Sequence, residues 1–263
     1  MAGRKPTAGG VLQALGIGIG LLAMVGGFVL LAVQYRPYTV PTGSMEPTVK
    51  SGETVLAEQV SGSAIGRGDI VVFKDADWGN SAMVKRVVGV GGDVVKCCDA
   101  QGRVTVNGVP LSESYLDTSP RSPGSGGSAG AALGAGPATQ QFSTTVPAGR
   151  LWLMGDSRAV SEDSRVHIDQ LGGSVPASAV IGRVEGVAWP LGAARTIDRT
   201  SVFDALPGAR ATDHGPLGLA TLATLGGAAL VLITAAAGTV AGMAGRKRSR
   251  PAPAQERTRS TTG

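Results

Sequence analysis

The chain has 263 residues, of which only 16% are charged, against roughly 25% in an ordinary soluble domain. Its 41 glycines and 15 prolines are more typical of strands and loops than of helices. The two cysteines are adjacent, which excludes a disulfide-rich scaffold and a four-cysteine zinc site, and two histidines leave little for a catalytic metal.

The net charge of +5 is concentrated at the two ends of the chain. Residues 1–10 contribute +2 through Arg4 and Lys5, and residues 246–263 contribute +5. The long stretch between them therefore carries about −2, which does not fit a nucleic-acid partner.

Residues 11–33 form an uncharged apolar run. As a helix they would span about 34 Å, enough for a bilayer core of roughly 30 Å. A cleaved secretory signal is the alternative, but its apolar region would be shorter and would end in a small-residue cleavage site. The run instead continues into Gln34-Tyr35-Arg36, so we expect an uncleaved transmembrane helix.

The segment 41–48, Pro-Thr-Gly-Ser-Met-Glu-Pro-Thr, begins eight residues after this run. Its prolines and glycine favour a rigid turn that presents the hydroxyl of Ser44. Taken alone, the same residues also fit a plain turn next to the membrane.

Residues 36–214 alternate short β-type runs with turn signals and contain no long apolar pattern of helical period. We expect an all-β domain, a barrel-like or folded sheet. The expected strands are 54–59, 69–74, 83–90, 93–96, 103–106, 151–154 and 180–188.

Lys85 lies among apolar residues within the expected strand 83–90. A lysine in such a strand usually points to solvent. If it is buried, its charged form becomes costly, its pKa falls, and it can act as a general base.

Cys97 and Cys98 follow the expected strand 93–96. Adjacent Cα atoms are about 3.8 Å apart, closer than the 4.4–6.8 Å of ordinary disulfides. We expect a disulfide between the neighbours, with two buried free thiols as the alternative and no catalytic role in either case.

Of the 23 residues from 118 to 140, 18 are Gly, Ser, Ala or Pro. This segment is expected to be a flexible insertion within the domain.

Further on, residues 155–165 carry several hydroxyls and alternating charges after the apolar run 151–154. They fit either an ordinary surface loop or a polar network that orients a catalytic group.

A second uncharged run covers residues 215–245 and ends at the basic cluster 246–250. Its alanines and glycines leave an interfacial or buried helix as the alternative to a membrane span. The positive-inside rule places residues 1–10 and 246–263 in the cytoplasm and the domain 36–214 outside it.

The segments around Ser44, Lys85 and 155–165 occur in an order and spacing that resemble bacterial type I signal peptidases. The resemblance covers nearly the whole chain. It includes Gly68-Asp69-Ile70-Val71-Val72-Phe73, Gly182-Arg183-Val184 and Trp189-Pro190.

The resemblance implies a membrane-bound Ser–Lys endopeptidase that removes signal peptides with small residues at the first and third positions before the cut. Its partners would be preproteins and the phospholipid membrane, with no cofactor, metal or obligate protein partner. It assigns Ser44 as nucleophile, Lys85 as general base and Ser161 as the hydroxyl that orients the base. Thr42 and the Ser44 N–H would form the oxyanion hole, and the surrounding structural charges would be Arg86, Asp156, Asp163 and Arg165.

Two residues depart from the family pattern: Gly91 stands for a proline and Ser157 for an asparagine. Both lie beside the dyad, so they put the loop geometry in doubt rather than the chemistry.

Other protease classes fit less well. A trypsin-like reading of Gly155-Asp156-Ser157 lacks the following glycines and has only His167 and His214 as bases. A penicillin-binding site needs Ser-x-x-Lys, but Pro47 stands at that spacing from Ser44. A membrane-anchored module without catalytic activity is the remaining alternative.

Overall fold

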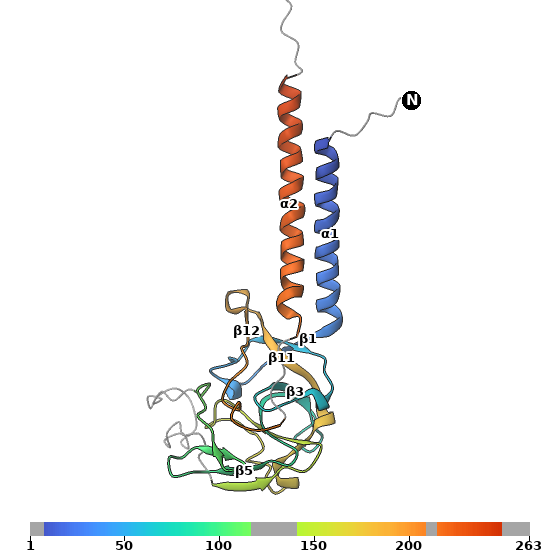
Figure 1. Cartoon of the computed structure of the whole chain (residues 1–263). Helices are drawn as coiled ribbons and strands as arrows, with labels where there is room; N and C mark the ends of the chain where they lie inside the picture. The colour runs from blue at the N-terminus through green and yellow to red at the C-terminus, as the bar shows by residue number, and fades with distance from the viewer. Residues whose placement is uncertain (1–7, 117–140, 209–214, 249–263) are drawn as a thin grey trace, which may run out of the picture. The chain divides into compact units, whose positions relative to one another are not determined.

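The computed structural model describes residues 8–116, 141–208 and 215–248 (Figure 1). The chain divides into two compact units, one of residues 1–31 with 219–263 and the other of residues 32–218. The insertion expected at 118–140 and the basic cluster beyond residue 248 lie outside the described residues.

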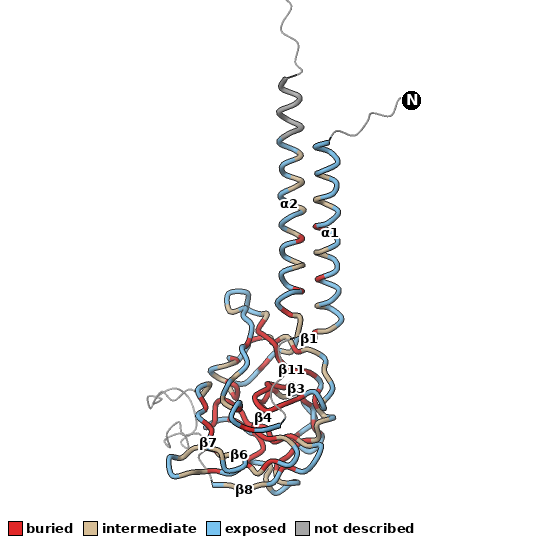
Figure 2. The backbone as a smooth tube through the Cα atoms, viewed as in Figure 1, coloured by how far each residue is buried: buried red, intermediate tan, exposed pale blue. Residues whose placement is uncertain are grey.

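Two long helices, α1 (Ala8–Gln34) and α2 (Leu217–Arg248), make up the described part of the first unit. Their mean hydropathies over the apolar spans are 2.4 and 2.0, and both are long and apolar enough to cross a membrane. The helices expected at 11–33 and 215–245 are therefore confirmed, with slightly different ends. Figure 2 shows that most of their surface is exposed, as a lipid-facing surface would require.

The two helices pack in antiparallel directions through small residues. A Cβ added to Gly20 would lie 2.9 Å from the Gly227 carbonyl oxygen and 2.8 Å from the Val231 side chain. Gly27, further along α1, meets the earlier Ala220 of α2 in the same way, with 2.7 Å to its carbonyl oxygen. Such close backbone approach is the usual basis of helix association in lipid.

The described part of the second unit contains two antiparallel sheets. The larger runs in the order β1-β2-β11-β3-β4-β9-β10, with β12 paired to β11, and the smaller in the order β7-β6-β5-β8. The strands of the larger sheet are β1 (Tyr35–Thr39), β2 (Thr54–Glu58), β3 (Ile70–Lys74), β4 (Ala82–Val90), β9 (Arg150–Met154), β10 (Val175–Pro176), β11 (Val180–Trp189) and β12 (Arg195–Thr196). Those of the smaller are β5 (Val94–Cys97), β6 (Val104–Val106), β7 (Val109–Pro110) and β8 (Phe142–Thr145).

This architecture confirms the expected all-β domain, and every expected strand is present. The structure adds β1, β7, β8, β10 and β12, which the sequence pattern did not indicate. The sequence pattern does not indicate β1 because it contains Pro37, and proline lacks the N–H that a central strand needs. β1 lies at the end of the strand order, where a proline is tolerated.

Three clusters of buried apolar residues hold the sheets together (Figure 2). Met45, Val49 and Val84 belong to the first, so the turn after β1 is anchored against β4. Cys97 belongs to the second and forms the expected disulfide with Cys98.

The turn between β4 and β5 is fixed by a buried ion pair. Arg67 donates to both carboxylate oxygens of Asp93, which also accepts from Val90 N at 2.8 Å. Gly91, where the family pattern has proline, meets the backbone of residues 147–149: an added Cβ would lie 3.0 Å from the Ala148 Cα. A residue without a side chain therefore suits this turn.

Replacing Gly20 with valine is expected to separate α1 from α2, because the added side chain meets the α2 backbone. The matched control is Gly18→Val, where an added Cβ has nothing within 4 Å.

Disulfide cross-linking between Gly16→Cys and Thr234→Cys, in a Cys97→Ser/Cys98→Ser background, measures the pairing. The yield in membranes should fall about threefold or more with Gly20→Val and stay unchanged with Gly18→Val. Equal yields in the two variants would contradict the small-residue interface.

Candidate active site

Ser44 lies in a short 3₁₀ turn, Gly43–Met45, between β1 and β2. Burial of the Met45 side chain holds the turn against the core, and Val49 N donates to Met45 O at 2.9 Å. The Ser44 carbonyl oxygen accepts a 3.0 Å hydrogen bond from Ser157 N. The turn is thereby tied to the loop after β9, and Ser44 itself is only 7% exposed.

Lys85 lies in the middle of β4, between β3 and β9, and is 4% exposed. Its Nζ donates to Ser44 Oγ at 3.0 Å and to Val84 O at 3.3 Å. Burial lowers the pKa of Lys85, although the carboxylates of Asp163, Glu162 and Asp156 oppose the shift. The structure thus brings together two side chains that are 41 residues apart in the sequence.

Thr42 precedes the turn in extended conformation, and its Oγ1 donates to Ser44 Oγ at 3.2 Å. The two hydroxyls and the Lys85 amine therefore form one connected group. Thr42 therefore lies beside Ser44 Oγ, and its expected part in an oxyanion hole stays a prediction.

Ser161 is buried close to this group, at 7% exposure. A Cβ added to Gly155 would collide with the Ser161 hydroxyl and lie 2.5 Å from the Ser44 carbonyl oxygen. The hydroxyl makes no hydrogen bond within the described part of the chain. It lies near enough to Asp163 to help lower that carboxyl's pKa, without the geometry of a full bond. Ser161 therefore makes no hydrogen bond to Lys85 in this structure, and its expected role in orienting the base stays a prediction.

Two buried ion pairs contain the other four residues singled out from the sequence. Arg86 donates to both oxygens of Asp156, at 2.8 and 2.7 Å, and Arg165 donates to both oxygens of Asp163, each at 2.8 Å. Burial alone would raise the pKa of Asp163, but the hydrogen bonds and charge of Arg165 outweigh it and hold that pKa below its usual value. All four side chains are at most 7% exposed, so these charges are structural and not the solvated surface that the sequence alone also allowed.

Sequence reasoning missed a third part of this network. Arg158 forms a buried bidentate pair with Glu113, and the Arg86 guanidinium lies 4.0 Å above the centre of the Tyr115 ring. Thr48 donates to Asp156 Oδ2 at 2.5 Å. Residues 113 and 115 lie beside the Gly-Ser insertion, and no pattern in that segment indicates a buried charge.

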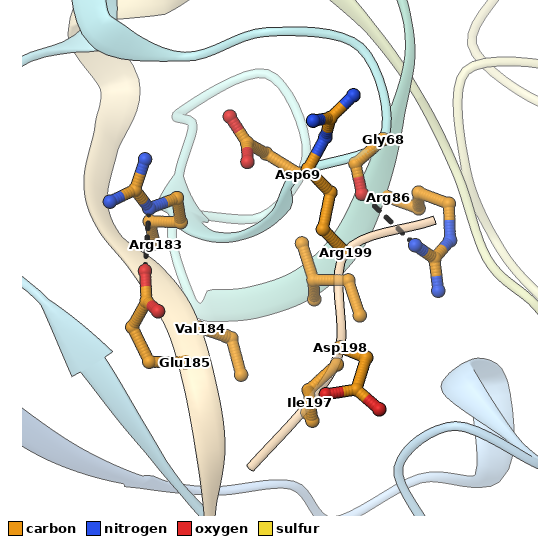
Figure 3. Close-up of a pocket in the computed structure, with 10 residues that line it drawn as sticks. Gly68, Asp69, Arg86, Arg183, Val184, Glu185, Ile197, Asp198 and Arg199 are labelled. Atoms are coloured by element: carbon orange, nitrogen blue, oxygen red, sulfur yellow. Dashed lines mark hydrogen bonds and ion pairs between the residues drawn. The ribbon is translucent and has the colours of Figure 1, made fainter. Parts of the chain in front are cut away.

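Arg86 also lines a small cavity, together with Asp69, Arg183 and Glu185 (Figure 3). Its volume is about 20 Å³, room for a water molecule and not for a peptide. Burial raises the pKa of Asp69 in its wall to about 6. Arg183 and Glu185 pair in the same wall at 2.7 Å, and Arg86 donates to Gly68 O at 3.0 Å.

His167, considered as an alternative base, is stacked on Trp78 with the ring centres 4.3 Å apart. Its Nε2 lies 3.6 Å from Glu162 Oε1. The other histidine, His214, falls outside the described ranges. Within those ranges, no group of three or more His, Cys, Asp or Glu side chains is arranged to hold a metal ion.

A family model described as "Signal peptidase, peptidase S26" matches residues 12–189 of the chain. The chain belongs to this family. It is a serine endopeptidase that cleaves signal peptides from preproteins, as the motifs around Ser44 and Lys85 implied. The two apolar helices fit a membrane-anchored signal peptidase.

Several curated relatives are signal peptidases. The signal peptidase I of Mycobacterium tuberculosis is 33% identical over 217 residues, covering 65% of this chain and 71% of the relative. Signal peptidase I U of Bacillus subtilis is 31% identical over 170 residues, covering 64% and 83%. A crystal structure of a signal peptidase I from Enterococcus faecalis is 28% identical, with a TM-score of 0.34, and covers 45% of this chain and 95% of that one.

Proposed function

We propose that Ser44 is the nucleophile and Lys85 the general base of signal-peptide cleavage by this chain. The 3.0 Å separation of Lys85 Nζ and Ser44 Oγ in a buried site carries the proposal. When the amine is neutral, the same separation lets the Ser44 hydroxyl donate its proton to Nζ.

In the first half of the reaction, Ser44 Oγ bonds to the scissile carbonyl carbon as Lys85 takes the hydroxyl proton. The protonated amine then gives that proton to the leaving nitrogen, and the C–N bond breaks to leave an acyl-enzyme. In the second half, water attacks the ester, Lys85 takes and returns a proton, and the free hydroxyl is restored. Each step uses water and side chains of this chain, and so we propose no cofactor and no obligate protein partner.

The burial of Lys85 supplies the neutral amine that this sequence of steps needs. An amine with the ordinary pKa of about 10.4 would be less than about 0.1% neutral at pH 7. The burial of Lys85 lowers its pKa, and this increases the fraction of the amine that is neutral.

The developing negative oxygen would be held by the backbone N–H of Ser44 and the hydroxyl of Thr42. A donor of this kind contributes on the order of 3 kcal/mol in comparable sites. The 3.2 Å hydrogen bond from Thr42 Oγ1 to Ser44 Oγ supports this role for Thr42. Ser161 would orient the amine, and Arg86, Asp156, Asp163 and Arg165 would keep the surrounding loops in place.

The substrates proposed are extended preprotein segments with small residues at positions −1 and −3 relative to the cut. An extended segment can pair as an added strand at a sheet edge.

We also propose that residues 11–33 and 215–245 cross the phospholipid membrane, with residues 1–10 and 246–263 in the cytoplasm. The catalytic domain 36–214, including the insertion 118–140, would then face the extracytoplasmic side.

Ser44→Ala and Lys85→Ala should each reduce cleavage of a preprotein by about 10³-fold or more, since each removes one half of the dyad. Lys85→Arg should be nearly as inactive, because a guanidinium does not deprotonate. Ser81→Ala and Lys74→Ala, at exposed positions near the ends of β3 and β4, serve as matched controls and should retain activity. Substantial turnover by a Lys85 variant in a preprotein cleavage assay would contradict the mechanism.

The dependence of kcat/KM on pH should fall on the acid side as Lys85 becomes protonated. Because burial lowers the pKa of Lys85, this limb should lie below pH 10.5, its ordinary value. A full pH series on a synthetic signal-peptide substrate measures it. A limb at or above the ordinary lysine value would mean that burial does not prepare this amine as a base.

A reporter fused after Gly263 should be active only in the cytoplasm, because the basic cluster 246–250 is retained on that side. The matched fusion after Pro207, before the second apolar run, should report the opposite side. Identical locations for both fusions would show that residues 215–245 do not span the membrane.

A further inference from the structure

The strap, defined here as residues 111–115, leaves β7 and lies against the catalytic loop 155–165. Leu111 begins it with a buried side chain and with a 2.8 Å hydrogen bond from its N–H to Val104 O. Ser112 and Ser114 are exposed, whereas Glu113 is buried and Tyr115 half-buried. The alternation directs one face of the strap toward the interior.

Glu113 brings the only carboxylate of the strap to a buried arginine of the catalytic loop. Its two oxygens accept from both terminal nitrogens of Arg158, and Oε1 also accepts from the Tyr115 hydroxyl at 2.6 Å. The Glu113 and Arg158 side chains are 2% and 4% exposed. The strap and the loop are thus joined by charge-assisted bonds shielded from water.

Arg158 links the strap to the residues around Ser44 through two further hydrogen bonds. Its Nε donates to Gly155 O at 3.1 Å, and its own carbonyl accepts from Arg165 at 2.9 Å. Gly155 is packed so closely against the Ser44 carbonyl and the Ser161 side chain that it has no room for a Cβ. A shift of Arg158 would therefore move the wall of the proposed site.

Tyr115 makes the second link, to the strand that carries Lys85. Its ring lies under the guanidinium of Arg86, the residue after Lys85, at 4.0 Å from ring centre to Cζ. Burial and the charge of Glu113 raise the pKa of Tyr115 well above its ordinary value, so its hydroxyl stays a donor. The ring thus covers the Arg86–Asp156 pair with a fixed aromatic face.

We infer that Glu113 and Tyr115 are positioning residues of the cleavage reaction. Through Arg158 and Arg86 they hold the loop 155–165 and β4 so that Lys85 Nζ stays within bonding distance of Ser44 Oγ. Neither residue touches the reacting atoms. The inference rests on the proposed Ser44–Lys85 dyad.

Glu113→Gln removes the charge and keeps the shape of the side chain, so it is the main test. The purified full-length variant should have a kcat about tenfold below that of the wild type and a KM within about twofold of it. The reason is that misplaced catalytic groups slow the chemical step more than they weaken binding. Tyr115→Leu should also lower kcat, and Tyr115→Phe less so, since phenylalanine keeps the ring. Asp99→Asn, which breaks a more exposed ion pair with Arg103 beside the same small sheet, is the matched control and should be unchanged.

The double variant Glu113→Leu/Arg158→Met distinguishes a loss of kcat caused by lost positioning from one caused by an unpaired buried charge. It removes both buried charges, so its Tm should recover relative to Glu113→Gln. Its kcat should stay low, because the bond from Arg158 to Gly155 is also lost. Recovery of kcat together with Tm would overturn the inference, as would wild-type kcat in Glu113→Gln.

The same assay includes Ser44→Ala and Lys85→Ala. Turnover in those variants would refute the dyad itself. With those variants inactive, wild-type turnover in Glu113→Gln would refute only the role of the strap. If Glu113→Gln does not fold, the comparison of Tyr115→Leu with Tyr115→Phe decides: equal wild-type kcat in both would overturn the inference.

Discussion

A lysine amine can accept a proton near neutral pH only where its charged form is costly, and the β unit meets this requirement for Lys85. β4 lies inside the larger sheet, between β3 and β9, and Lys85 on it is only 4% exposed, so its amine is withdrawn from water. The turn with Ser44 is closed over it by the apolar anchors Met45 and Val49. The same burial that stabilises the fold therefore prepares the proposed base.

That dry environment also contains many charges, and their pairing explains why it is stable. Arg86, Arg158 and Arg165 each donate two bonds to a buried carboxylate. Leaving one such charge unpaired costs about 3–5 kcal/mol, a large part of a domain's stability. The carboxylates oppose the lowering of the Lys85 pKa, but desolvation by burial is the largest effect and prevails. Two of them, Asp156 and Asp163, are also engaged by arginines.

The helices follow a different physical rule from the β unit. Their exposed side chains are apolar, and their mutual contact is made by glycines, as at Gly20 and Gly227. In lipid, apolar surface gives no drive for association, so close backbone packing must supply it. This explains why α2, although rich in alanine and glycine, can pack closely against α1.

The sequence by itself determined the all-β class, the two apolar helices and the strands with clear alternation, because local periodicity encodes them. It also singled out Ser44, Lys85 and the 155–165 loop through short motifs. It left Lys85 open between solvent and core, since a strand has two faces and only tertiary packing against those faces decides which side chains are buried. The tertiary structure alone decided the 3.0 Å approach of Lys85 to Ser44 and the burial of Glu113 against Arg158. Both join segments more than 40 residues apart, and the local sequence does not specify which distant charge will meet which.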